Sequence, residues 1–223
     1  MKRTVIFQLV MSVFILTQSC SDNASSEASG GEPAAKIAAA HGIAEFDKIK
    51  SLDFTFNVEK DSAHMQRRWK WFPQENRVIS YDQNDSVDFK RMDTSSALLK
   101  KLNAQFTNDE YWLIFPLHLK WDKGYTWSGG DTTTGITTTS ALRKYTVQYN
   151  NKDGFTPGDM YDLFVDNENV IREWAFHKGG SKEPSLVTSW DDYQDFNGLK
   201  IAKNHLSKDG KFRMHFTDIT VTH

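Results

Sequence analysis

The sequence has only one cysteine, Cys20, so no disulfide can form within the chain. It also lacks an excess of charge of either sign, because 27 basic residues stand against 29 acidic ones and give a formal net charge of -2. Without a basic excess the chain has little means of releasing counterions from a phosphate backbone, and nucleic-acid binding is not expected. With 39% hydrophobic and 25% charged residues, the composition excludes collagen-like, fully disordered and multi-span membrane proteins.

Long hydrophobic runs are missing too, with one short exception at the start of the chain. Lys2 and Arg3 precede an apolar run over residues 5–16. A helix that spans the hydrocarbon core of a bilayer needs about 20 apolar residues, and this run is shorter. A basic head, a short apolar stretch and small residues after it are typical of a secretory signal peptide, which we place at residues 1–19.

The end of this segment determines how the protein would meet a membrane. Ser19 directly precedes the lone Cys20, and this ending resembles a bacterial lipobox, with Gln18 as an imperfect member. The resemblance implies cleavage before Cys20 and attachment of acyl chains such as palmitate to its sulfur and new amino group. Several acyl chains anchor a protein stably. The alternative is an ordinary signal peptide with an incidental cysteine. We therefore expect a lipid-anchored protein of the bacterial cell envelope, at the outer membrane.

Residues 20–33 contain no large apolar side chain, so they form a flexible tether that follows the lipidated cysteine. Residues 34–223 are predicted to fold as a single domain. Its first element is a helix over 33–42, which is rich in alanine and ends at Gly42.

Most of the domain has the pattern of β-strands. Residues 52–58 alternate strictly between apolar and polar side chains, and Asn197-Gly198 is a strong signal for a tight hairpin. Strands are predicted at 52–58, 66–72, 77–81, 86–91, 160–165, 170–176, 186–193, 199–206 and 211–222.

The middle of the chain breaks this pattern. Residues 94–105 predict a short helix, and the apolar run 111–115 is either a buried helical turn or a buried strand. Residues 128–139, rich in glycine and threonine, predict a loop that merges into a weak strand. The expected fold class is α+β: one curled antiparallel sheet, or half-barrel, with the N-terminal helix and the short middle helix on its concave face.

Several segments resemble one uncharacterised family of bacterial envelope lipoproteins. They are DEYWLIFP at 109–116, FTPGDMY at 155–161, LFVD at 163–166, VIREW at 170–174, GG at 179–180, WDDY at 190–193 and GLKI at 198–201. Proteins of this kind are similar to the lipoprotein-localisation-factor (LolA/LolB-like) fold. That fold implies a half-barrel plugged by helices and a cavity for acyl chains, but it supplies no known binding residues.

The candidate ligand-binding residues are aromatic side chains on or against the predicted strands. They are Phe54, Phe56, Trp69, Trp71, Trp112, Phe115, Trp174 and Phe176. One interpretation is an apolar groove for a lipid or acyl chain, because Arg67 and Arg68 would rim an aromatic floor made by Trp69 and Trp71. The other is an ordinary core, since aromatic residues dominate burial in sheet proteins.

Signals for catalysis or metal binding are weak. No two of the seven histidines lie three, four or five residues apart, and none has a cysteine partner, so neither a metal site nor a cofactor is predicted. Ser128 lacks the G-x-S-x-G elbow of a serine hydrolase. The carboxylates Asp191 and Asp192 beside Trp190 predict a solvated hairpin rather than a glycosidase site.

Three functions remain open at this point. The first is non-enzymatic binding of a hydrophobic or amphiphilic ligand at the envelope, in lipid or lipoprotein handling. The second is an interaction module with a filled core that binds another envelope protein. The third, a hydrolase, has the least support because no catalytic residue is predicted.

Overall fold

The computed structural model describes residues 30–82, 85–150 and 156–223. The predicted signal peptide, Cys20 and most of the tether lie outside the described residues, and so does Phe155. Among the described residues, no helix combines the length and apolarity needed to cross a bilayer.

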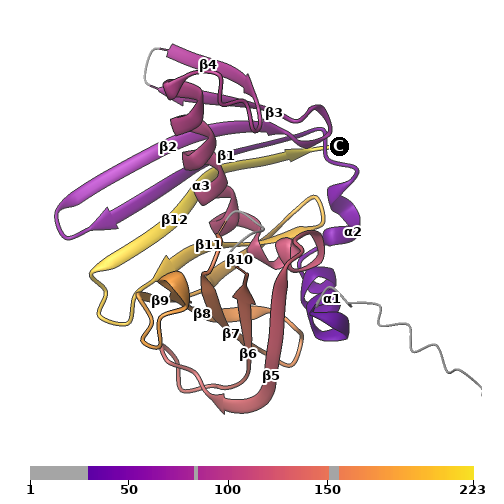
Figure 1. Cartoon of the computed structure of the whole chain (residues 1–223), viewed down its shortest axis with the longest axis vertical. Helices are drawn as coiled ribbons and strands as arrows, with labels where there is room; N and C mark the ends of the chain where they lie inside the picture. Colours follow the sequence, from indigo (N-terminus) through magenta and orange to yellow (C-terminus); the bar gives the residue numbers. More distant parts are fainter. Residues whose placement is uncertain (1–29, 83–84, 151–155) are drawn as a thin grey trace, which may run out of the picture.

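The described strands form two antiparallel sheets (Figure 1). In spatial order, the larger sheet consists of β10 (Asp191–Phe196), β11 (Leu199–Leu206), β12 (Phe212–Thr222), β1 (Ser51–Lys60), β2 (Ala63–Phe72), β3 (Arg77–Asp82) and β4 (Asp85–Lys90). The smaller sheet consists of β5 (Tyr125–Thr134), β6 (Ala141–Tyr149), β7 (Met160–Val165), β8 (Ile171–His177) and β9 (Leu186–Ser189).

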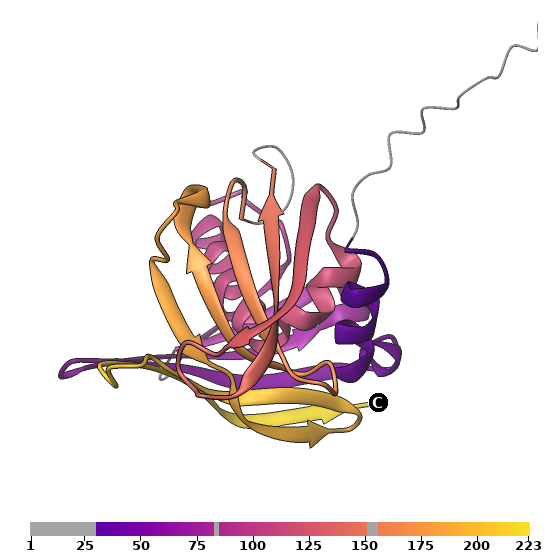
Figure 2. The same ribbon diagram turned by 90° about the horizontal axis from the view of Figure 1, so that it is seen from below.

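The helices are α1 (Gly31–Ala40), α2 (Ile43–Phe46) and α3 (Ala97–Trp121), with short 3-10 turns at Pro73–Glu75 and Lys178–Gly180. Figure 2 shows the larger sheet nearly edge-on, with the smaller sheet standing over one of its faces and the helices beside it. The middle helix α3 packs against both sheets. Its Phe106 and Leu113 belong to the core of the larger sheet, whereas its Phe115 and Leu119 belong to the core of the smaller one.

Helix α3 is longer than the sequence pattern predicted, and it absorbs the ambiguous run 111–115. Ser96 caps its start, because the Ser96 hydroxyl accepts a hydrogen bond from the Leu99 amide at 3.2 Å. Ile114 departs from helical geometry, with φ -136° and ψ 27°. The cause is Pro116, which has no amide hydrogen and whose ring crowds the carbonyl of Trp112. The prediction of a short helix ending near residue 105 was therefore wrong in length.

The predicted strand 186–193 is split between the two sheets. Trp190 separates β9 from β10, and its amide donates to the Arg172 carbonyl at 2.7 Å, while Thr188 bridges to Ser207. The chain thus passes from one sheet to the other at a buried tryptophan, which is 1% exposed. The expected single curled sheet is two sheets that meet at this corner.

Two further differences concern the smaller sheet. Residues 128–139 were expected as a loop that merges into a weak strand, and the structure places residues 128–134 in β5, where a bulge between Gly129 and Thr132 interrupts the pairing with β6. Strand β6 itself had not been predicted. Beyond β5, the buried carboxylate of Glu173 accepts hydrogen bonds from the amides of residues 136, 137 and 138 and fixes the turn before β6.

The broad predictions are confirmed. The fold is α+β with antiparallel sheets, an N-terminal helix and a middle helix. Helix α1 begins at Gly31, before the predicted start of the domain at residue 34. The hairpin between β10 and β11 has both turn residues at positive φ, 52° at Asn197 and 85° at Gly198, as its Asn-Gly sequence predicts.

Candidate ligand-binding cavity

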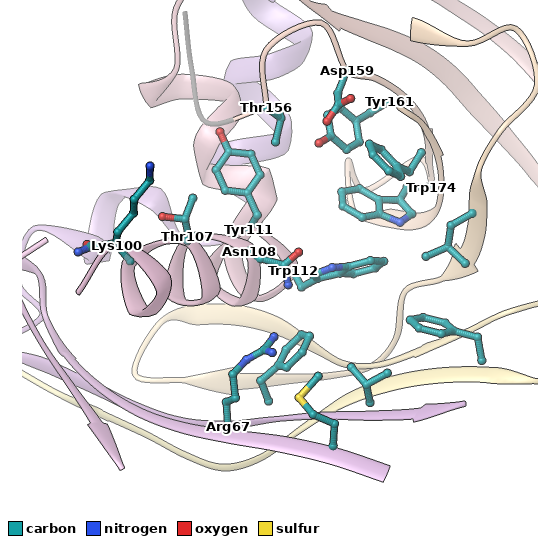
Figure 3. Close-up of a pocket in the computed structure, with 18 of the residues that line it drawn as sticks. Arg67, Lys100, Thr107, Asn108, Tyr111, Trp112, Thr156, Asp159, Tyr161 and Trp174 are labelled. Carbon is teal, nitrogen blue, oxygen red and sulfur yellow. The ribbon is translucent and has the colours of Figure 1, made fainter. Parts of the chain in front are cut away.

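A cavity of about 670 Å³ lies between the two sheets, beside the N-terminal half of α3 (Figure 3). Its lining comes from three sides. The floor is the inner face of the larger sheet, with Phe56, Val58, Met65, Arg67 and Phe212. The side wall is α3 together with Met92 and Thr94 of the segment before it, and the roof is formed by β7, β8, β9 and the turn before β7.

Four aromatic rings in contact form one surface of the cavity, which we call the aromatic wall. Trp112 of α3 packs on Trp174 of β8 with ring centroids 4.5 Å apart, and Trp174 packs on Tyr161 of β7 at 5.1 Å. Tyr161 in turn lies 5.4 Å from Phe176. Side chains alternate along the paired strands β7 and β8, which brings Tyr161, Trp174 and Phe176 to the same face of the smaller sheet.

The cavity opens toward the end of the larger sheet where β1 ends and where β2 and β12 begin. Figure 2 shows these strands reaching beyond the smaller sheet. Met65 and Met92 line this opening and are 39% and 65% exposed, while Val58 and Phe212 are half-buried. Because the described strands of the smaller sheet do not reach over this end, apolar side chains that would otherwise be core residues face solvent.

The polar part of the floor is a buried ion pair. Arg67 of β2 donates from Nε to Oδ2 of Asp109 on α3 at 2.7 Å, and its Nη2 donates to the other carboxylate oxygen. Trp69 and Asn108 donate to the same carboxylate at 2.8 Å and 3.0 Å. Burial raises the pKa of Asp109 above its ordinary value, and Arg67 opposes this shift. The pair joins α3 to the floor and neutralises the arginine that borders the cavity.

A second polar network lies at the kink of α3. It includes Tyr111, whose side chain also lines the cavity. His118 is held between Glu110 at 2.9 Å and Asp122 at 3.0 Å, and the hydroxyls of Tyr111 and Tyr149 donate to Asp122 at 2.5 Å and 2.8 Å. Burial alone would lower the pKa of His118, but Glu110 and Asp122 outweigh burial and raise this pKa to about 9. This network engages both ring nitrogens of His118, and the second carboxylate oxygen of Glu110 lies 3.7 Å from Nη2 of Arg91.

Of the eight aromatic candidates, the structure brings four together at the cavity, namely Phe56, Trp112, Trp174 and Phe176. The others, Phe54, Trp69, Trp71 and Phe115, lie outside the lining and are at most 3% exposed.

The two tryptophans of β2 show why the candidates divide in this way. Phe106 of α3 packs edge-on against Trp69 and Trp71, with centroids 5.5 Å and 5.6 Å away. The helix therefore covers this end of the sheet and leaves the other end open. Trp69 and Trp71 contribute to the core, whereas Arg67, further along the same strand face, borders the cavity.

Sequence reasoning did not single out Met65, Tyr161, Leu186 and Phe212, which also line the cavity. Each lies on a predicted strand or directly beside one, so the strand pattern could have shown that their side chains face inward. The pattern could not show that the sheets stay apart at this end.

The weaker candidates remain separate from the cavity. Ser128 is exposed on β5, and both ring nitrogens of His118 are engaged by carboxylates. Asp191 and Asp192 are exposed at the start of β10. Within residues 30–82, 85–150 and 156–223, no group of three or more histidine, cysteine or acidic side chains is arranged to hold a metal ion.

Comparison with known proteins gives only distant similarity. No protein-family model matches this chain, and no curated protein matches it significantly. A DUF1329 family protein from Desulfovibrio piger is 6% identical over 84% of this chain and 92% of its own, with a TM-score of 0.47. A domain from Vibrio parahaemolyticus, described as an outer membrane lipoprotein-sorting protein, is 9% identical over 77% of this chain and 85% of its own, with a TM-score of 0.47. TM-scores at this level do not establish a common fold.

Proposed function

We propose that this protein is a lipid-anchored protein of the bacterial envelope that binds the apolar part of an amphiphile in the cavity between its sheets. The binding is non-catalytic and serves lipid or lipoprotein handling. The observation that carries the proposal is the cavity of about 670 Å³, whose floor and roof are largely apolar and which opens to solvent at an apolar rim.

The size and chemistry of the cavity support a small apolar ligand. Ligand sites typically enclose about 300–1,000 Å³ and combine apolar walls with a few polar groups. Two cations line the cavity. Arg67 is already paired with Asp109, and Lys100 lies on α3, on the side of the cavity opposite Trp174 (Figure 3). A ligand that enters therefore removes apolar surface from water, which contributes roughly 25 cal/mol per Å² buried.

The membrane anchor is the second part of the proposal, and it depends on the N-terminal sequence. A lipidated Cys20 would hold the domain on a tether near a membrane, where amphiphiles are abundant.

A fluorescent fatty-acid probe tests the ligand-binding part. We expect the purified protein to bind it with a micromolar Kd, a free energy of about −8 kcal/mol. Met65→Asp places a charge at the cavity opening and should weaken binding at least tenfold. Leu206→Asp is the matched control, because Leu206 is 37% exposed, close to the 39% of Met65, and lies outside the lining.

Both substitutions are at partly exposed positions, so both variants should fold. A folded wild type that binds no probe of any chain length would contradict ligand binding and favour the alternative, an envelope protein-interaction module. Equal weakening by Met65→Asp and Leu206→Asp would show that the probe does not enter this cavity.

A further inference from the structure

The charged side chains of the cavity lining indicate what kind of head the amphiphile carries. Arg67 is neutralised by its pairing with Asp109. The other two, Lys100 of α3 and Asp159 in the turn before β7, form no ion pair in the part of the chain that the structure describes. Asp159 accepts a hydrogen bond from the Gly179 amide at 2.7 Å, which leaves its negative charge in place. A ligand in the cavity therefore meets one cation and one carboxylate.

These two charges belong to one polar edge of the cavity. Lys100, Ala104 and Thr107 line the cavity from a single face of α3, as their spacing of three or four residues requires. The small side chain of Ala104 leaves space between the other two. In Figure 3 the side chains of Lys100 and Thr107 project from α3 on the side of the helix where Thr156 and Asp159 lie. We call the set Lys100, Thr107, Thr156 and Asp159 the polar edge.

One kind of head satisfies both charges of the polar edge. A purely anionic head is repelled by Asp159, and a purely cationic head is repelled by Lys100. An uncharged head displaces water from both groups and returns no opposite charge to either. A head that carries an anion and a cation can pair with both groups at once.

The length of the cavity suits the acyl chain of a membrane lipid. With a rise of about 1.5 Å per residue, Lys100 lies about 18 Å along α3 from Trp112 of the aromatic wall. The acyl chains of one leaflet span half of a hydrocarbon core of about 30 Å, or about 15 Å. A chain that starts at a head beside Lys100 can therefore extend over the apolar floor to the aromatic wall.

We propose that the natural ligand is a zwitterionic amphiphile whose head combines a phosphate with a primary ammonium, of the phosphoethanolamine type. Lys100 pairs with the phosphate, for which a lysine ammonium is a common partner, and Asp159 pairs with the ammonium of the ligand. The acyl chain lies between the floor and the aromatic wall. This inference depends on the proposed binding function and narrows it to one ligand class.

The test compares three single-chain ligands that share a lauroyl chain, by calorimetric titration of the intact protein below their micelle concentrations. Lysophosphatidylethanolamine carries both charges, lysophosphatidylglycerol carries the phosphate alone, and monolaurin carries neither. We expect the wild type to bind lysophosphatidylethanolamine most tightly, about threefold or more tighter than lysophosphatidylglycerol, because only its ammonium offsets the charge of Asp159.

Two variants assign the charges. Lys100→Gln should weaken binding of both phospholipids about threefold to tenfold, and leave monolaurin binding unchanged. Asp159→Asn keeps an acceptor for the Gly179 amide, and it should weaken binding of lysophosphatidylethanolamine alone. The matched controls are Lys101→Gln and Asp131→Asn, at exposed positions outside the lining, and they should leave the affinities for all three ligands unchanged.

The outcomes separate this inference from the proposed function. Lysophosphatidylglycerol binding as tight as that of lysophosphatidylethanolamine would overturn the inference, and this comparison needs only the wild type if Asp159→Asn does not fold. A loss of monolaurin binding in Lys100→Gln as large as that of the phospholipids would also overturn it. Equal affinity for all three ligands would overturn it too, yet would leave the proposed function standing. If none of the three binds the folded protein, both proposals fail.

Discussion

The ion pair between Arg67 and Asp109 should hold α3 against the larger sheet, and replacing the arginine by methionine tests this directly. The Asp109 side chain is fully buried, whereas 20% of the Arg67 side chain is exposed. Arg67→Met leaves a carboxylate inside the protein with only Trp69 and Asn108 as donors. Breaking a buried pair in this way costs about 3–5 kcal/mol. For a domain of this size, a loss of about 3 kcal/mol lowers Tm by roughly 6–12 °C.

The double variant Arg67→Met, Asp109→Leu separates loss of the pair from loss of packing. It removes the buried charge and leaves the indole donor of Trp69 without an acceptor, which costs about 1–3 kcal/mol. The double variant should therefore be more stable than Arg67→Met alone. Urea unfolding followed by tryptophan fluorescence measures all three proteins.

The pH dependence gives an independent check of the same reasoning. Without Arg67, desolvation of Asp109 is less opposed, so its folded-state pKa rises further above the unfolded value. The folded variant then binds the proton more tightly than the unfolded chain, and its stability should recover as pH falls through the raised folded-state pKa toward the ordinary pKa of an aspartate. A loss below about 1 kcal/mol in Arg67→Met, or no recovery at lower pH, would refute the structural role of the pair.

Three further predictions concern other parts of the chain. Cys20→Ala should release the protein from the membrane fraction, and a variant that still pellets with membranes at high salt would rule out the lipid anchor. Gly198→Val should lower Tm, because Gly198 has φ 85° and a Cβ there would lie 2.5 Å from Cγ of Glu45; an unchanged melting curve would argue against this turn. His118 has its folded pKa raised from 6.5 to about 9, so its stabilising contribution is complete below about pH 6.5 and is lost as pH rises through about 9. In the wild type, the urea concentration at the unfolding midpoint should decrease as pH rises from about 6.5 to about 9. In His118→Gln this decrease should be smaller.

The sequence predicted strands where apolar and polar side chains alternate. In residues 52–58, Leu52, Phe54 and Phe56 join the apolar core, whereas Thr55 and Asn57 on the other face are buried and hydrogen-bond to β12. The Asn-Gly turn follows from backbone sterics alone. The sequence pattern did not identify the full strand β5. There Gly129 and Gly130 both take positive φ, and the bulge removes the alternation of apolar and polar side chains.

The sequence predicted that the site is apolar and aromatic, but it identified only some of the residues that line the cavity. Aromatic residues on strands signalled an apolar interior, and the sequence could not tell which of them a helix would cover. Phe106 decides this by packing on Trp69 and Trp71, and its position depends on the extension of α3 past residue 105. The partner of Arg67 also lies on that helix, 42 residues away in sequence, beyond the reach of local patterns.

Native mass spectrometry of the full-length protein, purified in a mild detergent from its natural host, tests the central claim most directly. The account predicts a population that carries one bound molecule of lipid-like mass in addition to any covalent acyl chains. Leu186→Asp, which places a charge in the lining, should abolish that population while the protein stays folded. A protein with only its covalent mass, which also takes up none of the fatty-acid probe, would contradict ligand binding in the cavity.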